Sequence, residues 1–592
     1  MKNGKCSAVA ACLAVAAFAC FHLLGVQAGQ QPQQSDQNRV IQNLRAFAKI
    51  YGYVKYFHPS DEASDTDWHK FAVLGVAAVK TAMDQEELET RLRELFLPIA
   101  PTMRLYRSGR KPTGPVLHSP EDPSGLKTVA WQHLGIELGR SRTYSSKRIN
   151  RKSKSPAGDE DESEKLFDKV PAIGECIEAK VSLGLHCQIP LALYSDQEST
   201  LGSTGDYPFQ ALKKRLSQIV LDKLPADDED VRFANLIIAW NVFQHFYPYF
   251  DVVKVNWESV LTKSLRETKE SSGTKEFYDV MRRLVEKLQD GHGGVYFPDM
   301  MPSGRFPVQL DWVENQLVVV YAGDSKNLRR GDIIRSFDGI LAERALKDIE
   351  QFISGSPQWK RSVSTVRRVG AGEIGTVIRL LIQRGDQEFE VEVERVDYAD
   401  VQKSKDRLIE QIEEGIYYVN LTTATMDEID SRMKSLAKAE GVIFDLRGYP
   451  RGGNHEVLQH LITEPVTSAR WNKPQVIYPD QKNLVGYDTS GRWQLTPKEP
   501  TLRGTIIFLT NARAISYAES IMGIVEHYHL AEIVGQPTAG TNGNVNPFKL
   551  IGGYRINWTG MKVLKHDGSQ HHLIGIRPTV GVRRTIKAVR EG

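Results

Sequence analysis

The sequence predicts a multidomain α/β protein, and three observations support this class. The chain is 592 residues long, whereas a single hydrophobic core rarely serves more than about 250–300 residues. Its last third alternates short apolar runs with a helical run, as chains that build a buried sheet covered by helices do. Residues 303–398 alternate apolar and polar side chains around one helical stretch, which predicts a separate strand-rich unit.

The predicted α/β core occupies residues 399–592. Apolar runs at 416–421, 441–446 and 505–509 are suited to strands of a buried sheet. Residues 516–529 have the apolar spacing of a helix.

An internal duplication organises the first half of the chain. Aromatic and proline residues coincide at a constant offset of 189 residues: Tyr51 with Trp240, Phe57 with Phe246, Pro59 with Pro248, and Trp68 with Trp257. Apolar residues recur at helical spacing in both copies, so 29–100 and 216–302 are predicted to be related helical units. The second copy has His292 where the first has Met103. The helical unit itself therefore does not need that histidine.

Residues 101–215, between the two copies, are rich in proline and glycine. Alternating apolar residues such as Ile189, Leu191 and Leu193 predict a β-rich domain. A basic stretch followed by an acidic one at 159–164 is typical of a solvated loop. The sequence assigns no function to this domain.

The first 28 residues have the three parts of a secretory signal peptide. Lys2 and Lys5 precede an apolar run and a small-x-small cleavage site that ends at Ala28. We expect export to the periplasm or the extracellular space, and no lipoprotein anchoring, because the lipidation box lacks its usual leucine. No later segment is apolar enough for a membrane span. Cys176 and Cys187 remain after cleavage and are candidates for a disulfide.

Composition and motifs argue against several classes of partner. Lysine and arginine exceed aspartate and glutamate by only 3 charges, so no global field favours nucleic acid. The chain has no His-Glu-x-x-His pattern, phosphate loop or paired cysteine ligand set, so we expect no metal, nucleotide or organic cofactor. A homo-oligomer remains open.

A turn followed by a strand lies at the centre of the 303–398 unit. It runs from residue 328 to 339 and resembles the corresponding turn of bacterial PDZ domains. The resemblance implies a domain that binds an extended peptide by strand addition and holds its terminal carboxylate on backbone N–H groups. It implies Leu328, Gly331, Asp332 and Ile333 as peptide-binding residues.

One serine stands where a nucleophile could be placed. Ser516 follows the apolar run 505–509 and a short turn, and it opens the predicted helix. The partial positive charge of a helix N-terminus favours a developing anion. A serine before a helix is also one of the commonest N-caps, so its position alone leaves a structural role open.

The sequence around Ser516 resembles the tail-specific (C-terminal processing) serine peptidase family. Residues 444–453 resemble the family's Asp-Leu-Arg-x-Asn-x-Gly-Gly signature, although with Tyr449 and one extra residue, and 516–519 and 535–540 resemble its nucleophile motif and the turn that follows. The resemblance covers residues 230–592. It implies a ClpP/crotonase-like core with an inserted PDZ-like domain, and polypeptide substrates that are unfolded or tail-exposed.

The resemblance also implies a set of catalytic groups. Ser516 would be the nucleophile of an acyl-enzyme. The oxyanion hole would come from the backbone N–H of Gly452 or Gly453 and of Tyr517. Glycine suits this role because a backbone without Cβ can approach the scissile carbonyl closely.

The general base departs from the commonest family pattern. Many members carry a lysine about 25 residues after the serine, where this chain has Thr541. The tricorn-like branch takes its base from a histidine just ahead of the PDZ-like module, and His292 stands there between glycines. An imidazole can accept the serine proton near neutral pH, so we expect His292 to be the base, with an ionisation between about pH 6 and 7.5. An exposed loop histidine is the structural alternative.

The acidic residue of the tricorn-like branch is replaced as well. Its position, three residues before Gly575, holds His572. Glu519 is a candidate substitute, although it could equally only stabilise the first turn of its own helix. The chain therefore lacks both the lysine and the acidic residue of the family. This leaves a second hypothesis open, a catalytically impaired peptide- or lipid-binding protein, since retinoid-binding proteins of the eye are similar to this core. An esterase-like acyl hydrolase is a third.

Overall fold

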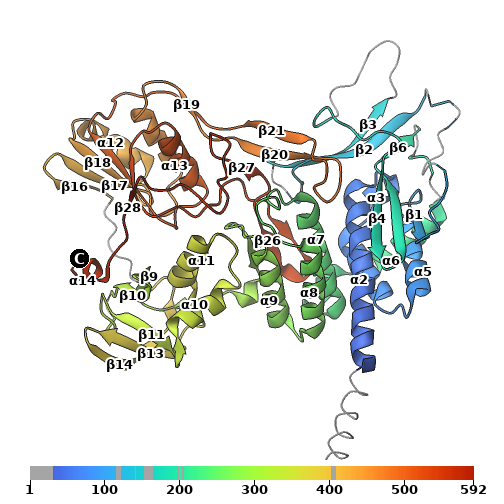
Figure 1. Cartoon of the computed structure of the whole chain (residues 1–592), viewed down its shortest axis with the longest axis horizontal. Coiled ribbons are helices and arrows are strands. Elements are labelled where there is room, and N and C mark those ends of the chain that lie inside the picture. The colour runs from blue at the N-terminus through green and yellow to red at the C-terminus, as the bar shows by residue number, and fades with distance from the viewer. Residues whose placement is uncertain are drawn as a thin grey trace, which may run out of the picture.

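The structure is a computed structural model. It describes residues 31–591 except 115–119, 121, 124, 140–141, 153–164, 197–198, 203–205, 324 and 402–407. The predicted signal peptide lies outside the described residues. In the part that is described, no helix combines the length and apolar character of a bilayer span. Figure 1 shows the α/β core and a second sheet at one end of the molecule, with the helical units beside them.

The α/β core contains a six-stranded sheet of order β16-β17-β18-β23-β24-β28. Its strands are β16 (Ile409–Glu413), β17 (Ile416–Asn420), β18 (Gly441–Asp445), β23 (Thr505–Thr510), β24 (Glu532–Gly535) and β28 (Val580–Gly581). All neighbours are parallel except β16 and β17. Helices α12 (Met426–Leu436) and α13 (Tyr517–His527) share a buried core with the sheet, centred on Phe444, Phe508 and Ile521. The predicted core strands and helix are confirmed.

A second six-stranded sheet, antiparallel throughout, occupies the predicted strand-rich unit. It consists of β9 (Gln309–Val313), β10 (Gln316–Tyr321), β11 (Ile333–Phe337), β12 (Ile340–Leu341), β13 (Val377–Arg384) and β14 (Gln387–Glu394). Helices α10 (Ala342–Glu350) and α11 (Pro357–Val363) follow β12, and a π-helical turn η4 (Ser364–Arg368) continues α11. Leu346 of α10 packs with Leu317 and Leu380 in the core of this unit.

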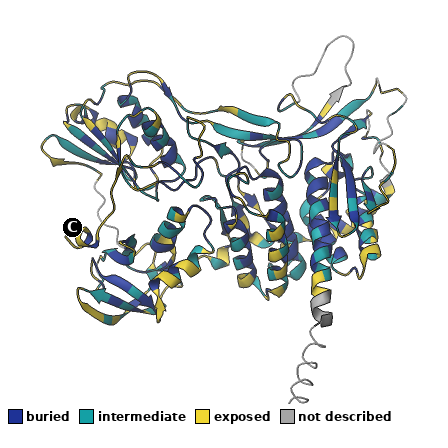
Figure 2. Ribbon diagram, viewed as in Figure 1, coloured by how far each residue is buried: buried dark blue, intermediate teal, exposed yellow. Residues whose placement is uncertain are grey.

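The duplicated helical units have equivalent helices. The first is α2 (Gln31–Phe57), α4 (Trp68–Val79) and α5 (Gln85–Phe96), and the second is α7 (Glu229–Phe246), α8 (Trp257–Glu270) and α9 (Thr274–Glu286). Tyr51 Oη donates a hydrogen bond to the carbonyl of Trp68, and Trp240 Nε1 makes the same bond to Trp257. The two units pack on each other, and α7 is buried on nearly all sides (Figure 2).

Close approach of the two units explains one glycine. A Cβ at Gly52 of α2 would lie only 1.9 Å from Oδ1 of Asn241 on α7. Asn241 donates instead to the carbonyl of Ala48, which ties the two helices together. Only glycine fits this crossing.

Strands of the 101–215 region form two sheets. One contains β1 (Arg104–Arg107), β5 (Leu185–Pro190) and β4 (Cys176–Ser182), and the other contains β2 (Lys127–Leu134), β3 (Ser145–Lys152) and β6 (Ala192–Ser195). The sheet of β2, β3 and β6 continues into β20 (Trp471–Val476), β21 (Gly486–Gly491) and β27 (Lys562–Val563). The 101–215 region and the 399–592 region therefore share a sheet, which the sequence did not indicate.

The two cysteines, whose pairing the sequence left open, do not form a disulfide. Cys187 lies opposite Ala179, and Cys176 lies opposite Pro190, in the β4–β5 register. Both are free thiols.

The remaining α-helices and strands are short except for α6, which has 12 residues. They are α3 (Asp61–Ser64), α6 (Asp206–Ser217), α14 (Ile586–Glu591), β7 (Gly294–Tyr296), β8 (Gly304–Arg305), β15 (Val396–Asp397), β19 (Val466–Thr467), β22 (Gln494–Leu495), β25 (Phe548–Lys549) and β26 (Arg555–Asn557). Helix α14 packs on the β9–β14 sheet through Val589, which contacts Val313, Val318 and Ile333. The end of the chain thereby connects the core to the second sheet.

Candidate active site

Ser516 lies at the sharp turn between β23 and α13, at the carboxyl-end edge of the parallel sheet. Its backbone has φ 59° and ψ −109°, a conformation that residues with a side chain seldom adopt. Its N–H donates to the carbonyl of Thr541 over 2.9 Å. Strain of this kind is found at strand-to-helix turns that present a nucleophile.

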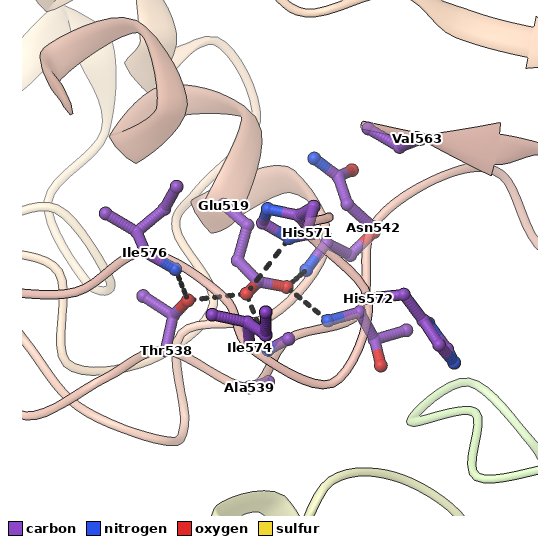
Figure 3. Close-up of polar contacts among 12 residues, drawn as sticks. Glu519, Thr538, Ala539, Asn542, Val563, His571, His572, Ile574 and Ile576 are labelled. Carbon is purple, nitrogen blue, oxygen red and sulfur yellow. Dashed lines mark hydrogen bonds and ion pairs between the residues drawn. The ribbon is translucent and has the colours of Figure 1, made fainter. Parts of the chain in front are cut away.

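The carboxylate of Glu519 holds the turn that contains Thr538 and Ala539 (Figure 3). This buried carboxylate accepts hydrogen bonds from Thr538 Oγ1 at 2.5 Å, from Gly540 N at 2.7 Å and from Thr541 N at 2.8 Å. It also accepts a longer bond, of 3.3 Å, from the N–H of Ser516. Burial alone would raise the pKa of Glu519, but the charge of His571 and these donors together hold it below its ordinary value. Both carboxylate oxygens of Glu519 therefore accept hydrogen bonds that hold residues 538–541 beside Ser516.

His571 and His572 have different surroundings. Nε2 of His571 lies 3.3 Å from Oε1 of Glu519. The ring of His572 is turned away from that carboxylate (Figure 3) and stacks on Tyr249 with ring centroids 4.0 Å apart. Burial lowers the pKa of His572 to about 4, so the ring is neutral at pH 7. Of the two, His571 is the neighbour of Glu519, which the sequence analysis did not anticipate.

His292 is held by a threonine and an aspartate. Nδ1 of His292 lies 2.9 Å from Oγ1 of Thr559. That hydroxyl donates to Oδ1 of Asp290 over 2.8 Å, so it must accept the proton of Nδ1–H. The other oxygen of Asp290 accepts from the N–H of Thr559 at 2.6 Å. This arrangement fixes the tautomer in which Nε2 carries the free lone pair.

A small antiparallel sheet, of order β25-β26-β7, brings these three residues together. Asn557 of β26 lies opposite Gly294 of β7, so Thr559 emerges beside His292. The Asp290 N–H donates to Ser354 Oγ at 2.8 Å. This bond anchors the loop of Asp290 and His292 to the unit that contains the β9–β14 sheet.

The loop that carries His292 touches the Ser516 turn through Thr541. Gly291 N donates to Thr541 Oγ1 at 3.0 Å, while the carbonyl of Thr541 accepts from Ser516. A Cβ at Gly291 would come within 2.7 Å of that hydroxyl, so glycine permits the approach. Thr541 therefore connects the His292 loop to the Ser516 turn, at the position where many family members carry a lysine.

Burial lowers the pKa of His292, and the charges of Asp290 and Glu519 oppose the shift. The imidazole is consequently neutral at neutral pH, in the form that can accept a proton.

The predicted oxyanion-hole residues also lie at this turn. The hydroxyl of Tyr517 accepts from the N–H of His455 at 3.0 Å, which seats the loop of Gly452 and Gly453 against the start of α13. Gly453 has φ 89°, a left-handed conformation suited to glycine. Apart from its two chain neighbours, no atom of the described residues lies within 4 Å of a Cβ built on Gly452, so its backbone borders open space.

Comparison with known proteins agrees with this geometry. Residues 415–582 match the model described as peptidase family S41. This region is therefore similar to S41 peptidases. This confirms the resemblance to tail-specific peptidases.

Curated relatives match part of the chain. A probable CtpA-like serine protease of Staphylococcus epidermidis is 26% identical over 247 residues, which cover 40% of this chain and 46% of the relative. A probable CtpA-like serine protease of Staphylococcus haemolyticus is 25% identical over 245 residues, covering 39% and 45%. The chain thus spans about half the length of the curated relatives it matches.

Solved structures share the fold. Mature CPAF aligns with a TM-score of 0.50 at 13% identity, over 61% of this chain and 94% of that chain. Mature CPAF complexed with lactacystin aligns with a TM-score of 0.51 at 14% identity, over 61% and 95%. At this identity the likeness concerns the fold alone.

The residues predicted to bind peptide lie mostly inside the unit of the β9–β14 sheet. Leu328, Asp332 and Ile333 are buried, and Asp332 pairs with Arg384 at 2.7 Å. A Cβ at Gly331 would meet the side chain of Arg590 of α14 at 2.4 Å. The side chains of Leu328, Asp332 and Ile333 therefore pack within the unit, and a peptide role of their backbone N–H groups stays a prediction.

Two cavities border the site. One, of about 530 Å³, is lined by His292, Gly291 and Trp359. The other, of about 760 Å³, lies at the ends of the core strands and includes Asn511 and Arg513, just ahead of Ser516. Among the described residues, no three His, Cys, Asp or Glu side chains converge as metal ligands.

Proposed function

We propose that this protein is an exported serine endopeptidase, which hydrolyses peptide bonds of unfolded or tail-exposed polypeptides through an acyl-enzyme on Ser516. The observation that supports the proposal is the Asp290–Thr559–His292 chain, which orients the imidazole so that the lone pair lies on Nε2. The loop that carries His292 bonds to Thr541, whose carbonyl accepts from the N–H of Ser516. Lysine is absent from the family position, and a correctly oriented imidazole supplies the missing base.

In the first half-reaction, Ser516 Oγ attacks the scissile carbonyl while its proton passes to Nε2 of His292. The C–N bond then breaks, and the leaving amine takes that proton. In the second half, His292 takes a proton from water, whose oxygen attacks the acyl carbon, and the proton returns to Ser516 as the carboxylic acid product leaves.

The negative charge on the substrate oxygen needs donors that are already in place. The backbone N–H groups of Tyr517 and of Gly452 or Gly453 are proposed as the oxyanion hole. The N-terminus of α13 adds partial positive charge at the same position.

The polar residues around these groups are proposed as positioning residues. Asp290 orients His292 through Thr559 and so replaces the acid missing at position 572. Glu519 keeps 538–541 and the strained Ser516 backbone in place. His572 is proposed to pack behind the site in its neutral form, where it contributes no proton at neutral pH.

Two further parts of the proposal rest on sequence. Residues 1–28 would direct export, and the 303–398 unit would act as a PDZ-like module that presents the substrate by strand addition. The comparisons do not favour the alternative of an impaired binding protein on the same fold.

The test is the Ser516→Ala variant with casein or a tailed peptide as substrate. Removal of the hydroxyl deletes the acyl acceptor but little packing, so cleavage should cease while circular dichroism is unchanged. Ser431→Ala, on the exposed face of α12, is the matched control and should cleave normally. Undiminished cleavage by Ser516→Ala would sink the proposal.

A further inference from the structure

The larger cavity lies between the second sheet and the carboxyl ends of the core strands. Its core side is formed by the last residues of four neighbouring strands: Asn420 of β17, Asp445 of β18, Thr510 of β23 and Gly535 of β24. Open α/β sheets bind ligands outside this edge. We call it the arginine cavity, because five arginines line it: Arg305, Arg330, Arg447, Arg513 and Arg584.

The positive charge of the arginine cavity is poorly compensated. Its acidic lining residues are Asp311 and Asp445. Asp445 is already paired with Arg447 at 2.6 Å. Within the described ranges, no carboxylate oxygen lies within 4.0 Å of a side-chain nitrogen of Arg330, Arg513 or Arg584. A wall of this composition attracts an anion.

The guanidinium groups come from distant segments and face one space. Arg584 lies on the segment between β28 and α14, which connects the core to the second sheet. Partial burial and the charges of Arg330, Arg447 and Arg513 lower the pKa of Arg584, while Asp311 opposes the shift.

The arginine cavity adjoins the smaller cavity that contains His292. Arg305 and Tyr398 line both it and the smaller cavity that contains His292. The smaller cavity adds Arg367 and Arg368 from the η4 turn. A polypeptide bound beside His292 would therefore lie next to an arginine-lined wall.

We propose that the arginine cavity is a subsite for acidic side chains, so that the enzyme selects polypeptides with several Asp or Glu residues beside the scissile bond. Carboxylates fit this wall because each can accept two parallel hydrogen bonds from a guanidinium group. Its volume of about 760 Å³ has room for more than one side chain. The inference rests on the proposed peptidase function, whose substrate class it narrows.

The test compares three reporter peptides that share one scissile sequence and differ in a flanking block of four Glu, four Gln or four Lys residues. Wild type should cleave the Glu peptide with a kcat/KM about tenfold above the Gln peptide, and added salt should shrink that ratio. In the double variant Arg513→Gln, Arg584→Gln the Glu-to-Gln ratio should fall to near one. Arg344→Gln, which removes an exposed arginine of α10 that is paired with Asp348, should keep the wild-type ratio.

Two further arms separate the possible failures. Each peptide is also made with an amidated C-terminus. If the preference for the Glu peptide over the Gln peptide disappears on amidation, the arginines bind the terminal carboxylate. That result would overturn the proposal. Binding of fluorescent peptides to Ser516→Ala is measured by anisotropy, without hydrolysis. If the Glu peptide binds more tightly than the Gln peptide and wild type cleaves neither, the acidic subsite is supported and the proposed peptidase function is rejected. Equal binding and equal cleavage of the Glu and Gln peptides would reject the subsite alone.

Discussion

At the scale of single residues, the hydroxyl of Thr559 determines which nitrogen of His292 is free. It donates to Asp290 and can therefore only accept from Nδ1–H. Sequence reasoning found Ser516, Tyr517 and His292 because each lies in a recognisable local pattern. It missed Thr559, which is 267 positions from His292 and meets it only through the β26–β7 pairing. Asp290, two residues before His292, was the available signal.

Replacement of Thr559 tests this relay. Thr559→Val keeps the shape but removes the hydroxyl, so Asp290 and His292 lose their common partner, and kcat should fall about 100-fold with little change in KM. Thr559→Ser, which restores a hydroxyl, should recover most of the rate. Comparable losses in both variants would show that packing, and not the hydroxyl, matters at this position.

The pH dependence of the rate follows from the surroundings of His292. The base must be neutral, and burial lowers its pKa, so activity should persist below the pH at which an exposed histidine would protonate. The profile of kcat/KM should therefore rise through a single midpoint below about pH 6.5, the ordinary histidine value. This revises the range of about pH 6 to 7.5 expected from an unperturbed imidazole. A midpoint above pH 7 on a short peptide would contradict the assignment.

At the scale of elements, α11 connects the second sheet's unit to the Ser516 site. Ser356, its N-cap, donates to the carbonyl of Ala539 at 2.6 Å, and Gln358 donates to that of Thr538 at 3.1 Å. Local periodicity predicted β17, β18 and β23 of the core sheet and the strand-rich character of residues 303–398. It could not predict that β2 pairs with β20, or that α11 supports residues 538–541, because such contacts join segments hundreds of residues apart and leave no periodic trace.

Excision of residues 303–398, with a flexible linker in their place, tests the supporting role of this unit. Since Ser354 and Ser356 hold the loops of His292 and of 538–541, turnover of short and long peptides should fall together. Initial rates on a chromogenic tripeptide and on casein provide the comparison. A loss confined to casein would mean that the unit only presents substrate.

At the scale of the whole molecule, three buried histidines lie where the helical units meet the β2 strand. The rings of His133 and His245 both contact Phe57 and Phe246 at this junction. Burial lowers the pKa of His58 to about 3, and of His133 and His245 to about 4. Folding therefore favours the neutral form of all three rings.

Acid should consequently weaken this junction within a defined pH window. The unfolded chain binds protons at these rings below about pH 6.5 and the folded chain only below about pH 4, so stability is complete above that window and falls as the pH decreases through it. Each ring contributes at most about 1.4 kcal/mol per pH unit. Urea midpoints measured at pH 7.5, 6 and 5 should decrease in that order, with a smaller pH dependence in His58→Gln. A midpoint that is constant from pH 7.5 to 5 would exclude the effect.

Labelling with a fluorophosphonate tests the central claim most directly, because this probe reacts only with a serine that is activated by a base and an oxyanion hole. The adduct is mapped by peptide mass spectrometry in wild type, Ser516→Ala and His292→Ala. We expect one adduct, on Ser516, that is absent from Ser516→Ala and forms orders of magnitude more slowly in His292→Ala. An adduct on another serine, or unchanged labelling of His292→Ala, would contradict the catalytic assignment, and no adduct on wild type would contradict an active serine peptidase.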